Sequence, residues 1–283
     1  MNGAYLANLS GRGQQVPSLP TLHGVFETIL VGRQLRAPYL PLWDLHVDRL
    51  VDGIYRTGLE LPPNLDRVHE EVRSQLFRID GELRLKLVVG RDEEHGACVL
   101  GLAWGAAPEV ERPTDPDAVR LMVRAEEIPP SEPESLLDED SGLPLGRIKS
   151  TDRRAYEMAL VAARSEGFQD ALLVAPGSEG QPSQVLETTI GNVFARIGGQ
   201  LVTTPAHGAR VPGVGQTAIL RELKSSGVDV DRREISLDEL RTADAIWVTN
   251  ALRGPRRASL DGGASQAEMA EDPLREAWSC ACR

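Results

Sequence analysis

The chain has 283 residues, of which 41% are hydrophobic and 26% are charged, and its formal net charge is -11. These values are ordinary for a globular protein that forms one large domain or two modest ones. The acidic balance and the scattered arginines argue against nucleic-acid binding, because phosphate contacts need a concentrated basic surface.

Targeting signals and cysteine chemistry are also not indicated by the sequence. No apolar run is long enough to span a membrane, and the N-terminus lacks a signal-peptide core, so we expect a cytoplasmic protein without a membrane partner. Cys98, Cys280 and Cys282 do not make a disulfide framework, and Cys280 and Cys282 favour a frayed C-terminal tail with free thiols. The dispersed histidines show no metal-ligand spacing, so no metal is predicted.

The first part of the chain alternates between strand and helix patterns. Strands are predicted where β-branched and aromatic residues gather, and helices where apolar residues recur every three or four positions. The predicted strands are 23–31, which ends in a turn at Gly32–Arg33, 83–90 and 97–104, and the predicted helices are 42–58 and 64–80. Together they predict a small N-terminal α+β lobe over residues 1–106.

Residues 107–119 have the proline-rich, charged composition of a linker, and a larger lobe over 120–283 is predicted to follow it. In this lobe a helix is predicted from Thr151 or Asp152 to the stop signal at Gly167. The other predicted strands are 170–176, 184–198, 200–205, 230–235 and 245–252, and the other predicted helices follow the loop 211–216 and cover 236–243.

Three features of the second lobe could carry chemistry. The chain has only three lysines, and Lys149 directly precedes a predicted helix; unlike arginine, lysine can lose its proton and form an imine. VPGVGQ (211–216) precedes another helix, where backbone N–H groups could bind an anion. Glu187 interrupts a strand-like run. A surface lysine, a plain loop and an exposed edge carboxylate would explain the three features equally well when each is taken alone.

In combination these features resemble the class IV aminotransferase family, the fold type IV enzymes that use pyridoxal 5'-phosphate. Five motifs carry the resemblance in the right order along residues 23–262. They are GVFETI (24–29), LHVDRL (45–50), LETTIGNVF (186–194), VPGVGQ (211–216) and the WVTNAL strand end (247–252), with Lys149 between the second and the third. The implied fold is a two-domain mixed α+β and α/β fold with a small N-terminal lobe and a larger β-rich lobe.

The resemblance implies a role for each matching residue. Lys149 would be the Schiff-base lysine and the base that moves the α-proton, and Glu187 would keep the pyridine nitrogen protonated. The phosphate would be held by one side chain and by backbone groups, from Arg49, Val214, Gly215, Asn250 and Ala251. The family also implies a homodimer with the active site between the lobes.

Departures from the common pattern bear on the reaction. Many transaminases of the family have a tyrosine five residues after the lysine; here that residue is Arg154, and Tyr156 follows it. KSTDRR (149–154) and TNAL (249–252) are closer to the forms found in aminodeoxychorismate lyases. The candidates for binding a substrate carboxylate are Arg91, Arg153 and Arg154.

We therefore expect a pyridoxal-phosphate enzyme that acts on a small amino acid or amine. The leading hypothesis is a 4-amino-4-deoxychorismate lyase that forms 4-aminobenzoate and pyruvate. The first alternative is a transaminase of branched-chain or D-amino acid type, and the second is a non-catalytic relative that has been repurposed.

Overall fold

A computed structural model describes residues 23–34, 37–62, 65–76, 83–91, 98–106, 118–125, 146–177, 180–260 and 272–282. The chain forms two compact units: unit 1 comprises residues 1–110 and 148–152, and unit 2 comprises residues 111–147 and 153–283. The segment that carries Lys149 thus groups with unit 1, although the sequence placed it in the second lobe. Residues 107–117 of the predicted linker lie outside the described part of the chain.

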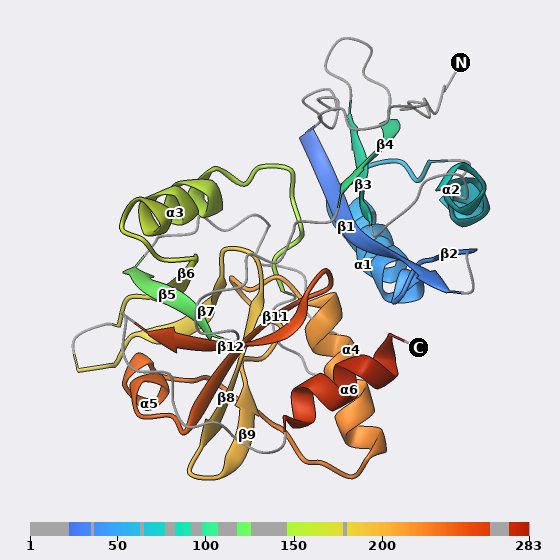
Figure 1. The fold of residues 1–283 in the computed structure, drawn as a ribbon. Coiled ribbons are helices and arrows are strands. Elements are labelled where there is room, and N and C mark those ends of the chain that lie inside the picture. The colour runs from blue at the N-terminus through green and yellow to red at the C-terminus, as the bar shows by residue number, and fades with distance from the viewer. Residues whose placement is uncertain are drawn as a thin grey trace. The chain divides into compact units, whose positions relative to one another are not determined.

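Unit 1 contains one antiparallel sheet in the order β2-β1-β3-β4 (Figure 1). Its strands are β1 (His23–Gln34), β2 (Ala37–Tyr39), β3 (Leu83–Arg91) and β4 (Cys98–Ala106), and its helices are α1 (Trp43–Arg56), the 3-10 turn η1 (Leu65–Arg67) and α2 (Val68–Leu76). The predicted hairpin of β3 and β4 is confirmed. The predicted turn at Gly32–Arg33 is wrong, because β1 continues to Gln34 and pairs with β2 there.

The core of unit 1 lies between one sheet face and the helices. Alternate residues of β1, namely Val25, Ile29 and Val31, pack with α1 residues Leu50 and Ile54, and all five are almost completely buried. Because side chains of a strand alternate between the two faces, Glu27 lies on this helix-covered face, and the even-numbered residues of β1 lie on the other.

Unit 2 contains an eight-stranded mixed sheet in the order β10-β9-β8-β11-β12-β5-β6-β7. Its strands are β5 (Ala118–Ala125), β6 (Asp170–Ala175), β7 (Gln184–Thr188), β8 (Asn192–Ile197), β9 (Gln200–Thr203), β10 (Asp231–Arg232), β11 (Ala245–Asn250) and β12 (Gly254–Leu260). The sheet curls, since Val185 of the edge strand β7 donates its N–H to the carbonyl of Ile235, which follows the opposite edge strand β10, at 2.8 Å.

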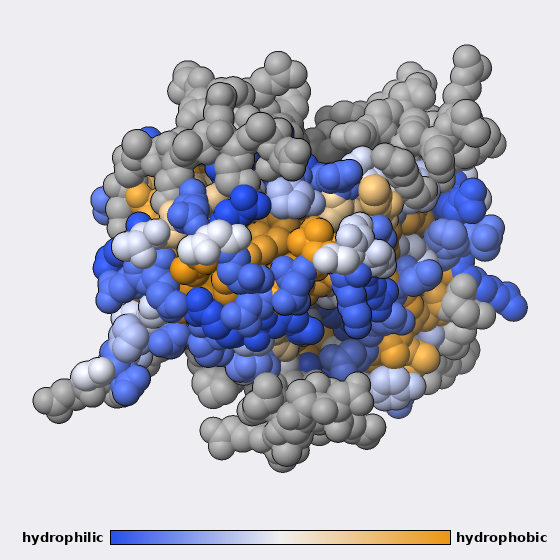
Figure 2. Space-filling model, turned by 90° about the horizontal axis from the view of Figure 1, so that it is seen from below, coloured by the Kyte–Doolittle hydropathy of each residue, from blue (hydrophilic) through white to orange (hydrophobic). Residues whose placement is uncertain are grey.

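Among the described residues of unit 2, four helices accompany this sheet: α3 (Arg154–Ser165), α4 (Val214–Ser225), α5 (Leu237–Arg241) and α6 (Pro273–Ala281). Within unit 2, α4 and α6 lie side by side and pack on Phe194 and Trp247 of the sheet, whereas α3 packs on β6 (Figure 1). Figure 2 shows apolar residues between hydrophilic ones on the face seen from below. No described helix is long and apolar enough to cross a membrane.

Several local predictions for unit 2 are corrected. The expected strand 184–198 is two strands, β7 and β8, because the chain turns at Gly191, where an added Cβ would lie 2.5 Å from the carbonyl oxygen of Thr249. Helix α3 has Arg153 as its N-cap, without a side-chain hydrogen bond, rather than Thr151 or Asp152. The expected frayed C-terminus is the helix α6, whose Leu274 is fully buried. The thiols of Cys280 and Cys282 are free, as expected.

Candidate functional site

Glu187 of β7 is a buried carboxylate whose two oxygens both accept hydrogen bonds. Only 3% of the residue is exposed. The hydroxyl of Tyr156, on α3, donates to Oε1 at 2.6 Å, and the backbone N–H of Val211 donates to Oε2 at 3.1 Å. Burial of a charge is costly unless it is hydrogen-bonded, and these donors offset that cost. An ionised carboxylate has about four acceptor sites, so it can accept from a further donor.

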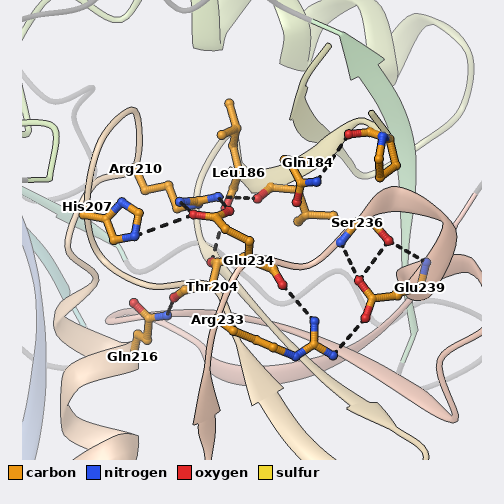
Figure 3. A network of polar contacts seen from close by, with 12 residues as sticks. Gln184, Leu186, Thr204, His207, Arg210, Gln216, Arg233, Glu234, Ser236 and Glu239 are labelled. Atoms are coloured by element: carbon orange, nitrogen blue, oxygen red, sulfur yellow. Dashed lines mark hydrogen bonds and ion pairs between the residues drawn. The ribbon is translucent and has the colours of Figure 1, made fainter. Parts of the chain in front are cut away.

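The loop that carries Val211 is anchored by its neighbour Arg210, which is 4% exposed (Figure 3). The guanidinium of Arg210 forms a two-pronged contact with Glu234, with Nη1 donating to Oε1 at 2.9 Å, and its Nη2 also donates to the carbonyl of Val185 at 2.9 Å. The amide of Asn192 donates to the carbonyl of Val211 at 3.0 Å. These contacts fix the direction of the Val211 N–H.

The N-terminus of α4 follows this loop and is built like an anion site. Its N-cap, Gly213, makes no side-chain cap, and its first turn contains no acidic residue. A Cβ added to Gly213 would collide with the side chain of Asn192, and one added to Gly215 would lie 3.0 Å from the carbonyl carbon of Asn250. The glycines therefore allow the first turn to approach the end of β11 closely, where its backbone N–H groups and helix dipole favour an anion.

The end of β11 forms the second side of this anion site. We call the site the phosphate cradle; it consists of residues 213–215 and 249–251. The side-chain oxygen of Asn250 accepts from the backbone N–H groups of Leu252 and Arg253, both at 3.0 Å, which fixes the turn after the strand. Thr249 is 1% exposed, and its hydroxyl has no hydrogen-bond partner in the described part of the chain. Thr249 is two residues after Trp247, which packs on α4, so it faces the same side. An unsatisfied buried hydroxyl beside a helix N-terminus fits a phosphate group.

Two arginines surround the ring of Tyr156. The guanidinium carbon of Arg153 lies 4.3 Å from the ring centroid, and that of Arg147 lies 5.5 Å from it. Arg153 also donates from Nη2 to the carbonyl of Thr189. Arg154 is exposed. Of the two neighbouring arginines that were predicted as substrate ligands, Arg153 is thus packed beside Glu187 and Tyr156, whereas Arg154 points to solvent.

Lys149 is held by β1 of unit 1. Phe26 donates its N–H to the carbonyl of Lys149 at 3.0 Å, and Thr151 donates its N–H to the carbonyl of Gly24 at 2.8 Å. The Nζ atom of Lys149 lies 4.9 Å from the centroid of the Phe26 ring, and Nζ of Lys86 lies 4.8 Å from the same centroid. The backbone contacts fix the lysine beside a mostly buried aromatic ring.

Arg49 of α1 is bound by a buried glutamate of its own unit. Its Nε and Nη2 donate to the two oxygens of Glu27 at 2.7 and 2.6 Å, and Nδ1 of His46 lies 2.7 Å from Oε2. Burial alone would raise the pKa of Glu27, but the charge of Arg49 and the hydrogen bonds from His46 and Arg49 outweigh it and lower the pKa to about 2. Burial lowers the pKa of His46, so its neutral ring donates from Nδ1 to the carboxylate.

The remaining sequence predictions fall in different places. Val214 and Gly215 begin α4, and Asn250 and Ala251 meet them at the end of β11, so the structure brings these four residues together. Arg91 is an exposed residue at the end of β3, paired with His23 and Cys98.

Sequence reasoning missed Glu27, Tyr156 and Thr249. The sequence contained a signal only for Glu27. This residue shares the apolar face of a strand with Val25, Ile29 and Val31, so its carboxylate must be buried and needs a partner. The partner of Tyr156 lies 31 residues away, and no local pattern indicates it.

Comparison with known proteins finds one family over most of the chain. The model of amino-transferase class IV matches residues 24–259. Among curated proteins, branched-chain-amino-acid aminotransferase 6 of Arabidopsis thaliana is 31% identical over 105 residues, which is 37% of this chain and 29% of that protein. The chain therefore aligns with less than a third of the length of this relative.

Solved structures show the same fold over nearly the whole chain. A hypothetical aminotransferase from Mycobacterium tuberculosis, in its PLP-bound form, has a TM-score of 0.73 and 22% identity, and the match covers 94% of each chain. A protein assigned as a candidate 4-amino-4-deoxychorismate lyase from Legionella pneumophila has a TM-score of 0.69 and 21% identity, with 92% of this chain and 90% of that chain covered. At these identities the likeness shows the fold, which is the predicted two-domain, fold type IV arrangement of mixed α+β character.

Proposed function

The chain belongs to the class IV aminotransferase family, and from this premise we propose that it is a 4-amino-4-deoxychorismate lyase. Enzymes of this family use pyridoxal 5'-phosphate. The observation that carries our assignment of the cofactor site is the buried carboxylate of Glu187, whose two oxygens are fixed by Tyr156 and Val211. Such a carboxylate suits a protonated ring nitrogen, because an adjacent anion favours the cationic form.

We assign the phosphate to the cradle at the N-terminus of α4. The N–H groups of Val214 and Gly215 and the backbone of Asn250 and Ala251 would bind it, and the Thr249 hydroxyl would donate to it. Arg49 would add a charge-assisted contact from the guanidinium that Glu27 holds in place through Nε and Nη2. The glycines, the absence of acidic residues from the first turn and the unsatisfied hydroxyl support this assignment.

Lys149 would perform the proton transfer. When bound, the cofactor supplies an aldehyde that bonds an amine and a ring that accepts electrons from the substrate's α-carbon. The Lys149 amine would hold the cofactor until the amino group of the substrate replaces it, and would then accept the α-proton. Loss of this proton and of the side chain as enolpyruvate would make the substrate ring aromatic. Enolpyruvate would take up a proton at its methylene carbon to become pyruvate, and the Lys149 amine would displace 4-aminobenzoate. Its backbone contacts with β1 support a fixed position for Lys149.

The start of α3 favours the lyase over a transaminase. Arg154 is exposed at the position where many transaminases of the family carry a tyrosine, and the buried Tyr156 contacts Glu187 instead. The alternative is transamination of a branched-chain or D-amino acid, and the similarity to a branched-chain aminotransferase favours it. Arg153, Arg154 and Arg91 remain our candidates for binding a substrate carboxylate. We also propose a cytoplasmic homodimer, and light scattering of the purified protein would test the dimeric state.

Pyruvate release without a keto-acid acceptor separates the two reactions. The cofactor-loaded protein is incubated with 4-amino-4-deoxychorismate, and pyruvate and 4-aminobenzoate are measured together. We expect equal amounts of both, and a fall of roughly 100-fold to 10,000-fold in Lys149→Ala, because general base catalysis is lost. Lys224→Ala is the matched control, since this lysine lies in the last turn of α4. Turnover that strictly requires a keto acid would establish the transaminase, and a chain that binds no cofactor would favour the non-catalytic relative.

A further inference from the structure

Tyr156 connects α3 to the carboxylate of Glu187. We propose that Tyr156 is a positioning residue that holds Glu187 ionised and aimed, and thereby keeps the proton on the ring nitrogen of the bound cofactor. This inference rests on the proposed function. The observation behind it is the 2.6 Å hydrogen bond from the Tyr156 hydroxyl to Oε1 of Glu187. Tyr156 is 4% exposed and Glu187 is 3% exposed.

The geometry of α3 turns Tyr156 toward Glu187 and turns residue 154 away from it. Successive residues of an α-helix are rotated by about 100°, so positions 154 and 156 lie on nearly opposite faces. Arg154 is exposed, whereas Tyr156 is buried together with Ala159 and Ala163, one and two turns further along the helix. A tyrosine at 156 therefore faces β6 and β7, and its hydroxyl reaches the carboxylate rather than solvent.

The surroundings of the ring keep the hydroxyl in place and protonated. Arg153 and Arg147 both lie against the ring, at 4.3 and 5.5 Å from its centroid, which restricts its movement. Burial, followed by the charge of Glu187 and its hydrogen bond, raises the pKa of Tyr156 well above its usual value, although the two arginines act in the opposite direction. The phenol therefore keeps its proton at pH values at which an ordinary tyrosine loses it.

The charge of the donors decides where a shared proton resides. A hydrogen bond to the ionised form of a carboxylate favours that form and lowers its affinity for a proton. Tyr156 and the Val211 N–H donate to the carboxylate, and the cationic Arg153 interacts with it electrostatically, so all three favour the ionised form of Glu187. A proton shared between Glu187 and the ring nitrogen then stays on the nitrogen. Without the hydroxyl, Glu187 binds a proton more strongly, and the ring nitrogen is protonated in a smaller fraction of the molecules.

The test measures the ring nitrogen directly. Wild type, Tyr156→Phe and Glu187→Gln are loaded with pyridoxal 5'-phosphate that carries 15N in the ring, and the 15N chemical shift is recorded by NMR. We expect a protonated nitrogen in wild type, a neutral one in Glu187→Gln and an intermediate shift in Tyr156→Phe. The kcat of Tyr156→Phe should fall roughly 10-fold to 100-fold, which is typical for loss of a hydrogen bond to a charged group.

The control is Tyr55→Phe, because Tyr55 is 69% exposed on α1; its 15N shift should equal that of wild type. A purely structural role of Tyr156 would change the melting temperature of the apo protein and leave the 15N shift of the loaded protein unchanged. That result would overturn the inference. If wild type bound no cofactor, the proposed function would fail instead, so the two failures are distinguishable.

A titration of wild type keeps the inference testable if Tyr156→Phe does not fold. Because Tyr156 remains protonated, the 15N shift of the ring should stay constant from neutral pH to the alkaline limit of folding. A transition with a midpoint near 10, the ordinary value of tyrosine, would contradict the inference, since it would show a phenol that loses its proton.

Discussion

Glu27 in unit 1 and Glu187 in unit 2 are both buried glutamates, and they differ in the charge of their donors. Glu27 is held by the guanidinium of Arg49 and by a neutral His46, so a cation of the same unit neutralises it. Glu187 accepts from a phenol and a backbone amide, and the cationic Arg153 interacts with it electrostatically. The carboxylate of Glu27, bound at both oxygens by a guanidinium, serves stability and orients Arg49, whereas we propose the Glu187 carboxylate, held by a phenol and a backbone N–H, as the partner of a cationic ligand.

The largest effect is expected from removal of the cation in unit 1. Arg49→Met leaves Glu27 buried with only His46 of its described donors, and breaking such a pair should cost roughly 3 to 5 kcal/mol of unfolding free energy. Urea unfolding of the full-length apo protein measures it. Asp52→Asn on the same helix is the control, because its 3.2 Å contact with Arg56 is exposed on the aspartate side and should contribute less than about 1 kcal/mol. Equal effects of both changes would contradict the comparison.

Acid should remove the contribution of Glu27 to the free energy of unfolding within a defined pH range. Its pKa is lowered from 4.5 to about 2, so the folded state favours the ionised form. The resulting stability is complete above pH 4.5 and is lost as the pH falls through the range down to about 2. The loss should reach roughly 3 kcal/mol, because each pKa unit corresponds to 1.36 kcal/mol. Glu27→Gln should flatten this part of the stability curve, and an unchanged slope in that variant would assign the acid loss to other groups.

The smallest expected effect has opposite signs in the apo and loaded proteins. Thr249→Val replaces the unsatisfied hydroxyl with a methyl group of similar size, which should raise the stability of the apo protein by about 1 kcal/mol. If the hydroxyl donates to the phosphate, the same change should weaken cofactor binding roughly tenfold. Urea unfolding and fluorescence titration with pyridoxal 5'-phosphate measure the two quantities. Unchanged cofactor affinity would remove Thr249 from the phosphate cradle.

Local signals in the sequence predicted much of the fold. Periodicity located α1, the predicted stop signal Gly167 has a positive φ angle, and the predicted helix over 236–243 is α5, which begins with a full capping box between Ser236 and Glu239. Strand β12 was missed although it pairs with its neighbour β11, and β5 was missed because it pairs in parallel with β12 and β6, which are distant in the sequence. Such pairings leave no mark within a short window of residues.

The candidate site was predictable where a motif is local and not where a contact is distant. The motif around residues 211–216 indicated the N-terminus of α4, and the structure adds that Gly215 approaches Asn250. The family resemblance implied a phosphate contact for Arg49 without its partner Glu27, which is 22 residues away. Similarly, the spacing from Lys149 drew attention to Arg154, whereas the helix phase of α3 selects Tyr156 for the contact with Glu187.

Borohydride reduction followed by peptide mass spectrometry tests the central claim most directly, because the chain has only three lysines. Borohydride fixes an imine between a lysine and pyridoxal 5'-phosphate as a stable amine, and the mass of the labelled peptide then identifies the residue. Our account predicts the label on Lys149 alone, with stoichiometry near one per chain. A label on Lys86 or Lys224, or a wild-type protein that takes up none, would contradict it.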